Sequence, residues 1–331
     1  MTVSDAPLIA AHDLRVTFAL QREGDMPWTA PRLLQAVAGV DFTLNSGQTL
    51  GIVGESGSGK STLARALIQM VPATGRVVWQ GKTDLLALTP HQMLAYRRDI
   101  QMVFQDPLAS LNPRMTVGQI VAEPLRTHYP ALDAAEVKAR VQVMMDRVGL
   151  LPNQINRYPH EFSGGQCQRI GIARALIVEP KLLICDEPVS ALDVSIQAQV
   201  INLLARLQRE LGVTMIFIAH DLSVVKHVSD QVMVMYLGRV MEARGKRDLF
   251  SAPQHPYTQA LLSAVPIPDP AAERAKVMIP LDGELPSPMN PPSGCVFRTR
   301  CFRAQGRCTT EVPVLTAGVA CHFPGALQRA G

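Results

Sequence analysis

The sequence lacks any uninterrupted apolar stretch approaching about 18 residues, so we do not expect the chain to span a membrane by itself. Residues 1–7 lack the basic-then-apolar pattern of a signal peptide. The sequence also lacks a long basic run and an internal repeat, and its net charge of +4 is mild. These absences predict a cytosolic chain and give no reason to expect nucleic acid as a partner.

What is present indicates a folded protein. The chain has 331 residues, 47% of them hydrophobic and 18% charged, which excludes a disordered chain. This length predicts one large domain and a smaller one. Six cysteines in a cytosolic chain are expected to be reduced thiols or metal ligands, because disulfides are rare in that compartment.

The hydrophobic periodicity predicts alternating helices and strands. Such alternation indicates a parallel sheet with crossover helices, preceded by strands from a different layer. The predicted strands are residues 8–20, 37–44, 50–53, 76–80, 182–185 and 214–219, with an edge pair at 232–236 and 239–243. The predicted helices are residues 62–68, 116–125, 134–148, 164–178 and 195–211.

A glycine-rich turn follows the strand at 50–53. Its pattern is Gly54-x-x-x-x-Gly59-Lys60-Ser61, which is typical of a phosphate-binding loop at the start of a helix. A surface turn rich in Gly and Ser is the alternative. The residues expected to contact ATP are Gly54, Gly57, Ser58, Gly59, Lys60, Ser61 and Thr62. Lys60 is expected to reach the β- and γ-phosphates, and the Ser61 hydroxyl to ligate Mg²⁺.

Two carboxylates end the apolar strand at 182–185. We predict that Asp186 holds Mg²⁺ through water and that Glu187 orients the attacking water. His220 ends the strand at 214–219, where it could hydrogen-bond the γ-phosphate, although a lone histidine is more often structural.

A second candidate phosphate-binding site begins the helix at 164–178. It consists of Ser163, Gly164, Gly165 and Gln166, about a hundred residues after the first loop. A single chain does not need two γ-phosphate sites for one nucleotide.

Together these motifs resemble the ATPase subunits of ABC transporters. Gln105 matches the Q-loop, which also contacts Mg²⁺; Asp193 belongs to the D-loop; and Phe18 is the candidate that stacks on adenine. Ser163–Gln166 matches the signature motif, with Phe162 in place of the commoner Leu. The resemblance implies two chains placed head to tail, each lending its signature motif to the ATP of the other.

The resemblance also implies a fold. We expect an α/β P-loop ABC ATPase domain over residues 1–265, with a RecA-like core, an antiparallel β subdomain and a helical subdomain at about 107–178. A small irregular domain with a cysteine cluster is expected over 266–331, where the sequence becomes rich in proline.

Four further segments resemble the oligopeptide/dipeptide importer branch of this family, and residues 167–172 most resemble its F-type ATPase subunits. The segments are 105–114, 157–166, 255–262 and 283–288. This resemblance implies a motor at the cytoplasmic face of the inner membrane. Its expected partners are a homologous ATPase, two transmembrane permease subunits and an extracytoplasmic peptide-binding protein.

The alternatives are import of dipeptides, murein peptides, nickel or heme, or a soluble ABC ATPase outside transport. Proteins of the last kind usually carry two cassettes or a long coiled-coil insertion, and this chain has neither.

The last 37 residues contain Cys295, Cys301, Cys308 and Cys321. Four cysteines in a segment too small for its own core suggest a metal site. Because the closely paired cysteines of most zinc sites are absent, the spacing favours a [4Fe-4S] cluster, as the resemblance does; zinc and free thiols are the alternatives. Nearby arginines could offset the charge of such a cluster or form a solvated basic face. Cys167 and Cys185 are expected to be packed thiols.

Overall fold

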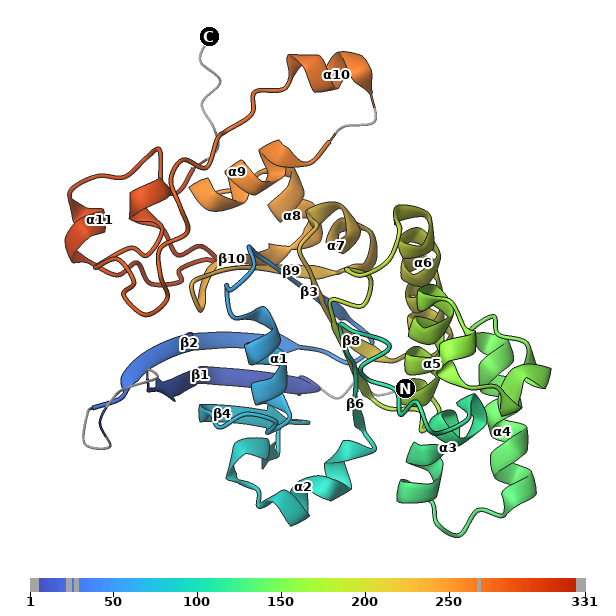
Figure 1. The fold of residues 1–331 in the computed structure, drawn as a ribbon. Helices are drawn as coiled ribbons and strands as arrows, with labels where there is room; N and C mark the ends of the chain where they lie inside the picture. Colours follow the sequence, from blue (N-terminus) through green and yellow to red (C-terminus); the bar gives the residue numbers. More distant parts are fainter. Residues whose placement is uncertain (1–5, 22–25, 27–29, 267–268, 326–331) are drawn as a thin grey trace. The chain divides into compact units, whose positions relative to one another are not determined.

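The computed structural model describes residues 6–21, 26, 30–266 and 269–325 (Figure 1). Contacts divide the chain into two compact units. The first comprises Leu44–Thr49, Ala87–Ala219 and the segment ending at Leu8. The second comprises Ile9–Thr43, Leu50–Leu86 and the segment from His220 onward. Each unit therefore combines segments that are distant in sequence.

The second unit contains an antiparallel sheet with the order β2-β1-β4-β5. Figure 1 labels β2, β1 and β4 of this sheet. In β1, Leu14 and Val16 are buried while their neighbours are more exposed, as expected for a sheet with one face on a core. The strand β2 begins earlier than the predicted residue 37. These strands are β1 Ile9–Leu20, β2 Arg32–Leu44, β4 Thr74–Trp79 and β5 Thr83–Asp84.

A second group of strands in this unit positions the phosphate loop. The strand β3 (Thr49–Val53) is buried throughout and pairs in parallel with β9 (Gln231–Tyr236). In turn, β9 pairs antiparallel with β10 (Arg239–Gly245), as the sequence predicts. The helices of this unit include α1 Lys60–Leu67, α7 Leu222–Val228, α8 Lys246–Ser251 and α9 Pro256–Ala264.

The first unit contains three parallel strands in the order β8-β7-β6, which confirms the predicted parallel pairing. Its strands are β6 Ile100–Val103, β7 Leu182–Asp186 and β8 Thr214–Ala219. Its helices are α2 Pro90–Arg97, α3 Val117–His128, α4 Ala134–Arg147, α5 Gly164–Leu176 and α6 Val194–Leu211. The hydrophobic periodicity of the sequence did not predict α2 or β6.

The regular elements in the described part of the C-terminal segment are short: α10 Pro270–Ala275, the 3₁₀ turn η4 Arg298–Arg300 and α11 Arg307–Thr310. Backbone hydrogen bonds attach it to β10, from Ala243 N–H to Gly318 O and from Ala320 N–H to Met241 O, both at 2.9 Å or less. Its separation as a domain beginning at residue 266 stays a prediction. Across the described ranges, no helix combines the length and apolarity needed to cross a membrane.

Candidate nucleotide site

The phosphate loop begins where β3 ends. Its lysine, Lys60, is only 3% exposed, and its ammonium group donates to the carbonyl oxygens of Gly54 at 2.8 Å and Glu55 at 3.0 Å. The loop backbone therefore holds the charge of Lys60 at the N-terminus of α1, where both lysine and helix dipole favour a phosphate group.

Close approaches of the backbone explain two loop glycines. At Gly59 φ is +96°, and a Cβ would lie 2.2 Å from the carbonyl oxygen of Ala36. At Gly54 a Cβ would lie 2.2 Å from the carbonyl oxygen of Met235 on β9. Neither position has room for a side chain, so the loop requires glycine for packing as well as for conformation.

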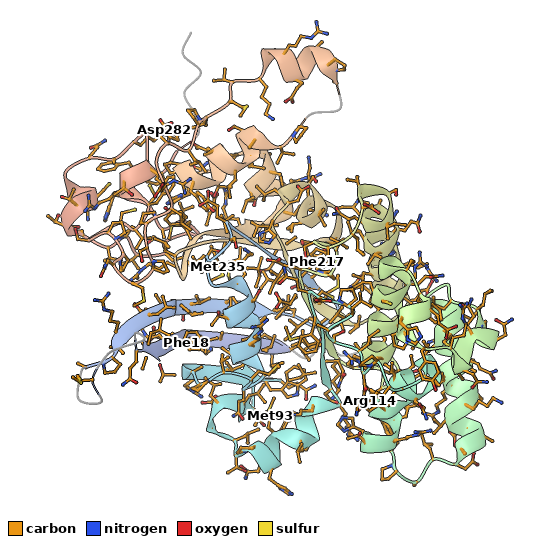
Figure 2. All side chains as sticks on the ribbon, in the orientation of Figure 1. Phe18, Met93, Arg114, Phe217, Met235 and Asp282 are labelled. Atoms are coloured by element: carbon orange, nitrogen blue, oxygen red, sulfur yellow. The ribbon has the colours of Figure 1, made fainter. Side chains whose placement is uncertain are left out.

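The other candidate ATP contacts in the second unit lie on the same elements. Ser61 and Thr62 occupy the first turn of α1 and are half-buried, while Ser58 is buried. Phe18 lies on β1 and is half-buried (Figure 2). Its exposed portion is available for stacking, and its contact with adenine stays a prediction. Gly57 is exposed and has open space around it.

In the first unit, two predicted catalytic side chains meet. Gln105 follows β6 and Glu187 follows the adjacent β7, so parallel pairing brings the ends of these strands to one edge of the sheet. The Gln105 side-chain amide donates to Glu187 Oε2 at 2.8 Å. Asp186, the last residue of β7, is fully buried.

Glu187 has an unusual backbone. Its φ is +47°, in the left-handed region that residues other than glycine seldom adopt, and its side chain belongs to a residue only 5% exposed. Its N–H donates to the Ile218 carbonyl on β8 at 3.2 Å. Such local strain persists where the surroundings fix it, and it is frequent at functional sites.

The predicted signature motif forms the N-terminus of α5. Ser163 and Gln166 make a capping box, in which Ser163 N–H donates to Gln166 Oε1 at 2.9 Å and Gln166 N–H to Ser163 Oγ at 3.4 Å. A Cβ on Gly165 would meet Ile196 at 2.4 Å, and one on Gly164 would lie 3.6 Å from Leu192. The motif therefore packs against the first turn of α6 and the residues just before it.

Asp193 is exposed and begins α6, and His220 is exposed directly after β8. The structure thus brings Gln105, Glu187 and the signature motif into the first unit. It places the phosphate loop and Phe18 in the second unit, with His220 at its boundary. That Gln105 and Glu187 act on the nucleotide held by the phosphate loop, and the signature motif on the nucleotide of a partner chain, stays a prediction.

The four tail cysteines differ in how far they are buried. Cys295 and Cys308 are buried, and Cys301 and Cys321 are half-buried. Burial is the main cause that raises the pKa of Cys301 to about 11, and the charges of the other three sulfurs add to it. Within the described residues, however, no three His, Cys, Asp or Glu side chains form a group able to hold a metal ion. The predicted cluster therefore has its donors here but not a formed site.

The two remaining cysteines are buried thiols. Burial raises the pKa of both Cys167 and Cys185, so they stay protonated, in line with the prediction that they pack as small apolar residues.

Two residues from the C-terminal part of the chain, Tyr257 and Arg300, contact Glu55 in the phosphate loop, and the sequence did not predict either contact. The side chain of Glu55 accepts two hydrogen bonds from Arg300, and its N–H donates to the Tyr257 hydroxyl. No periodicity or motif indicates these pairs, since 245 residues separate Glu55 from Arg300.

Comparison with known proteins shows which class of ATPase this chain resembles. A family model described as "ABC transporter" matches residues 37–190. The ATP-binding cassette MJ0796, solved as a dimer bound to ADP and Pi, is similar with a TM-score of 0.64 and 27% identity, over 72% of this chain and 99% of that chain. CbiO1 from Clostridium perfringens is similar with a TM-score of 0.63 and 28% identity, over 75% and 92% of the two chains.

Curated relatives extend this similarity over nearly the whole sequence. The oligopeptide transport ATP-binding protein OppF of Escherichia coli (strain K12) is 63% identical over 93% of this chain and 92% of the relative. OppF of Haemophilus influenzae is 59% identical over 99% of both chains. The chain belongs to the ABC transporter family, as an ATP-hydrolysing subunit. A second family model, "Oligopeptide/dipeptide transporter, C-terminal region", matches residues 241–308.

Proposed function

We propose that this chain is the motor subunit of an importer for oligopeptides, in which ATP binding and hydrolysis by a pair of ATPases drive uptake through membrane subunits. The observation that carries the proposal is the 59–63% identity to OppF proteins over at least 92% of each chain. The match of the C-terminal region to oligopeptide and dipeptide transporters supports it, because that region lies outside residues 37–190, which the general ABC transporter model matches.

Each predicted site residue would have its own role in ATP binding or hydrolysis. Lys60 and the loop amides bind the phosphates, and Phe18 stacks on adenine. Mg²⁺, held by Ser61, Gln105 and Asp186, would offset the phosphate charge when bound. The oxygen donors of these side chains suit that hard cation.

Hydrolysis depends on a positioned water. Glu187 orients and polarises this water, and His220 contacts the γ-phosphate. The hydrogen bond from Gln105 aims the Glu187 carboxylate, and the strained backbone of Glu187 fixes its direction. Asp193 and the motif Ser163–Gln166 act on the nucleotide of the partner ATPase, where the free N–H groups of α5 meet its γ-phosphate.

We propose that the chain works at the cytoplasmic face of the inner membrane and has four partners. They are a homologous ATPase, two permease subunits and an extracytoplasmic peptide-binding protein. The segment after Gln105 would contact a cytoplasmic helix of a permease.

We also propose that the tail cysteines hold a [4Fe-4S] cluster. The four tail thiols support this assignment, whereas the missing convergence of three ligands opposes it. Iron and sulfide analysis of protein purified without oxygen tests it. Four irons per chain support a cluster, one zinc per chain identifies a zinc site, and metal-free protein leaves free thiols.

The proposed function is tested by native affinity purification of this chain from detergent-solubilised membranes. We expect a homologous ATPase and two membrane subunits to copurify. Recovery of ribosomal or DNA-repair proteins without a membrane subunit would overturn the proposal.

A second measurement identifies the cargo. With the complex in liposomes, binding protein loaded with a tetrapeptide should stimulate ATP hydrolysis, while the Glu187→Gln complex gives the background. Stimulation only by dipeptide, murein peptide, nickel complex or heme would replace the oligopeptide assignment.

A further inference from the structure

Glu55, the second residue of the phosphate loop, is held at three points. Its carbonyl oxygen accepts from the Lys60 ammonium at 3.0 Å, so it forms part of the lysine's environment. Its N–H donates to the hydroxyl of Tyr257 on α9 at 3.0 Å. Its carboxylate accepts from both terminal nitrogens of Arg300, at 2.7 and 3.1 Å. Two of these three contacts come from residues far along the chain.

The ion pair between Glu55 and Arg300 has the features of a strong interaction. It is bidentate, and the side chains are only 27% and 8% exposed, so solvent screens it less than the surface pairs of this chain. The hydrogen bonds to Glu55 also raise the pKa of Arg300, which therefore stays charged. Removal of one partner would leave the other charge partly buried without its counterion.

Arg300 is itself fixed by the packing around it. Three residues earlier, Phe297 is fully buried, with its ring centroid 5.3 Å from that of Tyr236 on β9 and 5.2 Å from that of Tyr257. Arg300 interacts electrostatically with the phenol of Tyr236, although the Arg300 Nε and the Tyr236 hydroxyl have no hydrogen-bond partner with acceptable geometry in the described structure. The aromatic contacts hold the 3₁₀ turn η4 in place.

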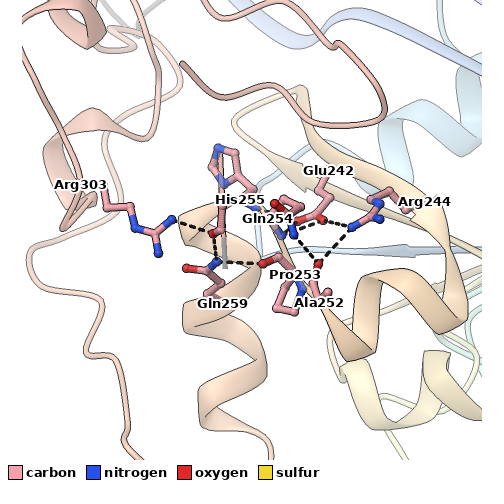
Figure 3. Close-up of polar contacts among 9 residues, drawn as sticks. Glu242, Arg244, Ala252, Pro253, Gln254, His255, Gln259 and Arg303 are labelled. Atoms are coloured by element: carbon pink, nitrogen blue, oxygen red, sulfur yellow. Dashed lines mark hydrogen bonds and ion pairs between the residues drawn. The ribbon is translucent and has the colours of Figure 1, made fainter. Parts of the chain in front are cut away.

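Tyr257 is fixed as well. Its N–H donates to the Nδ1 of His255, which caps α9, and its ring packs against Tyr236 with centroids 4.9 Å apart. A buried glutamate supports this cap, because Glu242 on β10 accepts from the N–H groups of Gln254 and His255 (Figure 3). The hydroxyl that meets Glu55 therefore projects from a rigid element.

We propose that Arg300 and Tyr257 are positioning residues for ATP binding, which fix Glu55 and through its carbonyl the ammonium of Lys60. This assigns a role to the C-terminal region: it braces the start of the phosphate loop from outside the ATPase core. The inference rests on the proposed role of the phosphate loop in binding ATP. It predicts that ATP affinity depends on residues that never touch the nucleotide.

The test is ATP affinity of the full-length chain, measured by displacement of a fluorescent ATP analogue below the unfolding temperature. We expect Arg300→Gln, Glu55→Gln and Tyr257→Phe each to weaken ATP binding about tenfold, the effect of losing one charge-assisted or buried hydrogen bond. Arg300→Lys keeps the positive charge but cannot form the two parallel hydrogen bonds of a guanidinium group. Its ATP affinity should therefore lie between that of Arg300→Gln and that of the wild type.

The double variant Glu55→Gln/Arg300→Gln distinguishes positioning from general damage. It leaves no unpaired charge, so it should bind ATP no more weakly than either single variant, whereas independent effects would multiply to about a hundredfold. In the assembled complex, the single variants should raise KM for ATP more than they lower kcat.

Arg307→Gln is the matched control. Arg307 also pairs with a glutamate at 2.7 Å, Glu311, but both side chains are more than half exposed and neither meets the loop. It should bind ATP like wild type. Wild-type affinity in folded Arg300→Gln and Glu55→Gln, or a hundredfold loss in the double variant, overturns the inference. Failure of the wild-type chain to bind ATP would instead overturn the proposed function.

Discussion

Glu187 accepts a hydrogen bond from the Gln105 side chain at 2.8 Å while its own backbone stands at a φ of +47°. The two residues are 82 positions apart, and the parallel pairing of β6 with β7 places them at the same edge of the sheet. The carboxylate is thereby held from two sides, by a donor and by a constrained main chain. This is the arrangement expected of a group that must aim one water molecule.

Glu187→Gln is therefore expected to abolish turnover and to leave ATP binding intact. Glutamine can still accept the bond from Gln105, but it carries no negative charge to polarise water. The loss in kcat should be at least roughly a hundredfold. Phosphate release by the assembled complex measures it, with ATP affinity as the control. Undiminished release would show that another group activates the water.

Gly59→Ala should eliminate ATP binding. The added Cβ would lie 2.2 Å from the carbonyl oxygen of Ala36, so the loop must move. Gly47→Ala is the control, since Gly47 has a similar positive φ of +75° but nothing within 4 Å. It should cost about 1–2 kcal/mol of unfolding free energy for the left-handed backbone and leave ATP affinity unchanged. Equal ATP affinities in the two variants would contradict this account of the loop.

Two glycines of α5 should respond in opposite ways. Gly165→Ala places a Cβ 2.4 Å from Ile196, and we expect a loss of about 1–3 kcal/mol in unfolding free energy together with reduced ATPase activity. Gly171→Ala meets nothing within 4 Å and should stabilise the helix by about 0.5–1 kcal/mol. Urea unfolding of both variants measures the difference. A stabilised Gly165→Ala would show that α5 and α6 are not packed as described.

His255 should make stability fall in mild acid. It is 1% exposed, and burial lowers its pKa to about 3, whereas in the unfolded chain it titrates near the usual 6.5. Its Nδ1 accepts the N–H of Tyr257, so the native state needs the neutral ring. Below the unfolded pKa only the unfolded chain gains this proton. The contribution of His255 is thus complete above about pH 6.5 and lost as pH falls toward 3, by about 1.4 kcal/mol per pH unit.

Urea unfolding between pH 7.5 and 5 measures this dependence. His255→Asn, which can still cap α9 but does not titrate, should lower stability at pH 7.5 and flatten the slope below pH 6.5. His160, exposed beside Tyr158, offers a control, and His160→Asn should retain the wild-type slope. An unchanged slope in His255→Asn would assign the acid sensitivity to other groups.

The sequence alone predicted the parts whose signals are local. The strands predicted at residues 182–185 and 214–219 are almost entirely apolar and correspond to β7 and β8. The helices predicted at 116–125 and 134–148 have clear periodicity and correspond to α3 and α4. The helix α2 was not predicted because only Met93 is buried along it, so its sequence has no apolar periodicity. Its start was nevertheless encoded, since Thr89 and Gln92 form a capping box around Pro90.

The candidate site likewise has parts with a local sequence pattern, which could be predicted, and parts without one. Glycine spacing predicted the phosphate loop, and acids at a strand end predicted the roles of Asp186 and Glu187, which stay predictions. The link from Glu55 to Arg300 could not be foreseen, because an ion pair leaves no local pattern and Arg300 stood among several tail arginines. Sequence spacing also could not decide the cysteine question, since ligand convergence is a property of three-dimensional structure.

The ion pair between Glu55 and Arg300 can form only late in the synthesis of the chain. Glu55 leaves the ribosome 245 residues before its partner, which at about 5–20 residues per second is a delay of roughly 10–50 s. A nascent chain with its glycine-rich turn already formed would still lack the guanidinium that holds it. The nucleotide pocket would thus mature last, after translation has nearly ended, and a prematurely terminated chain would be a poor competitor for ATP.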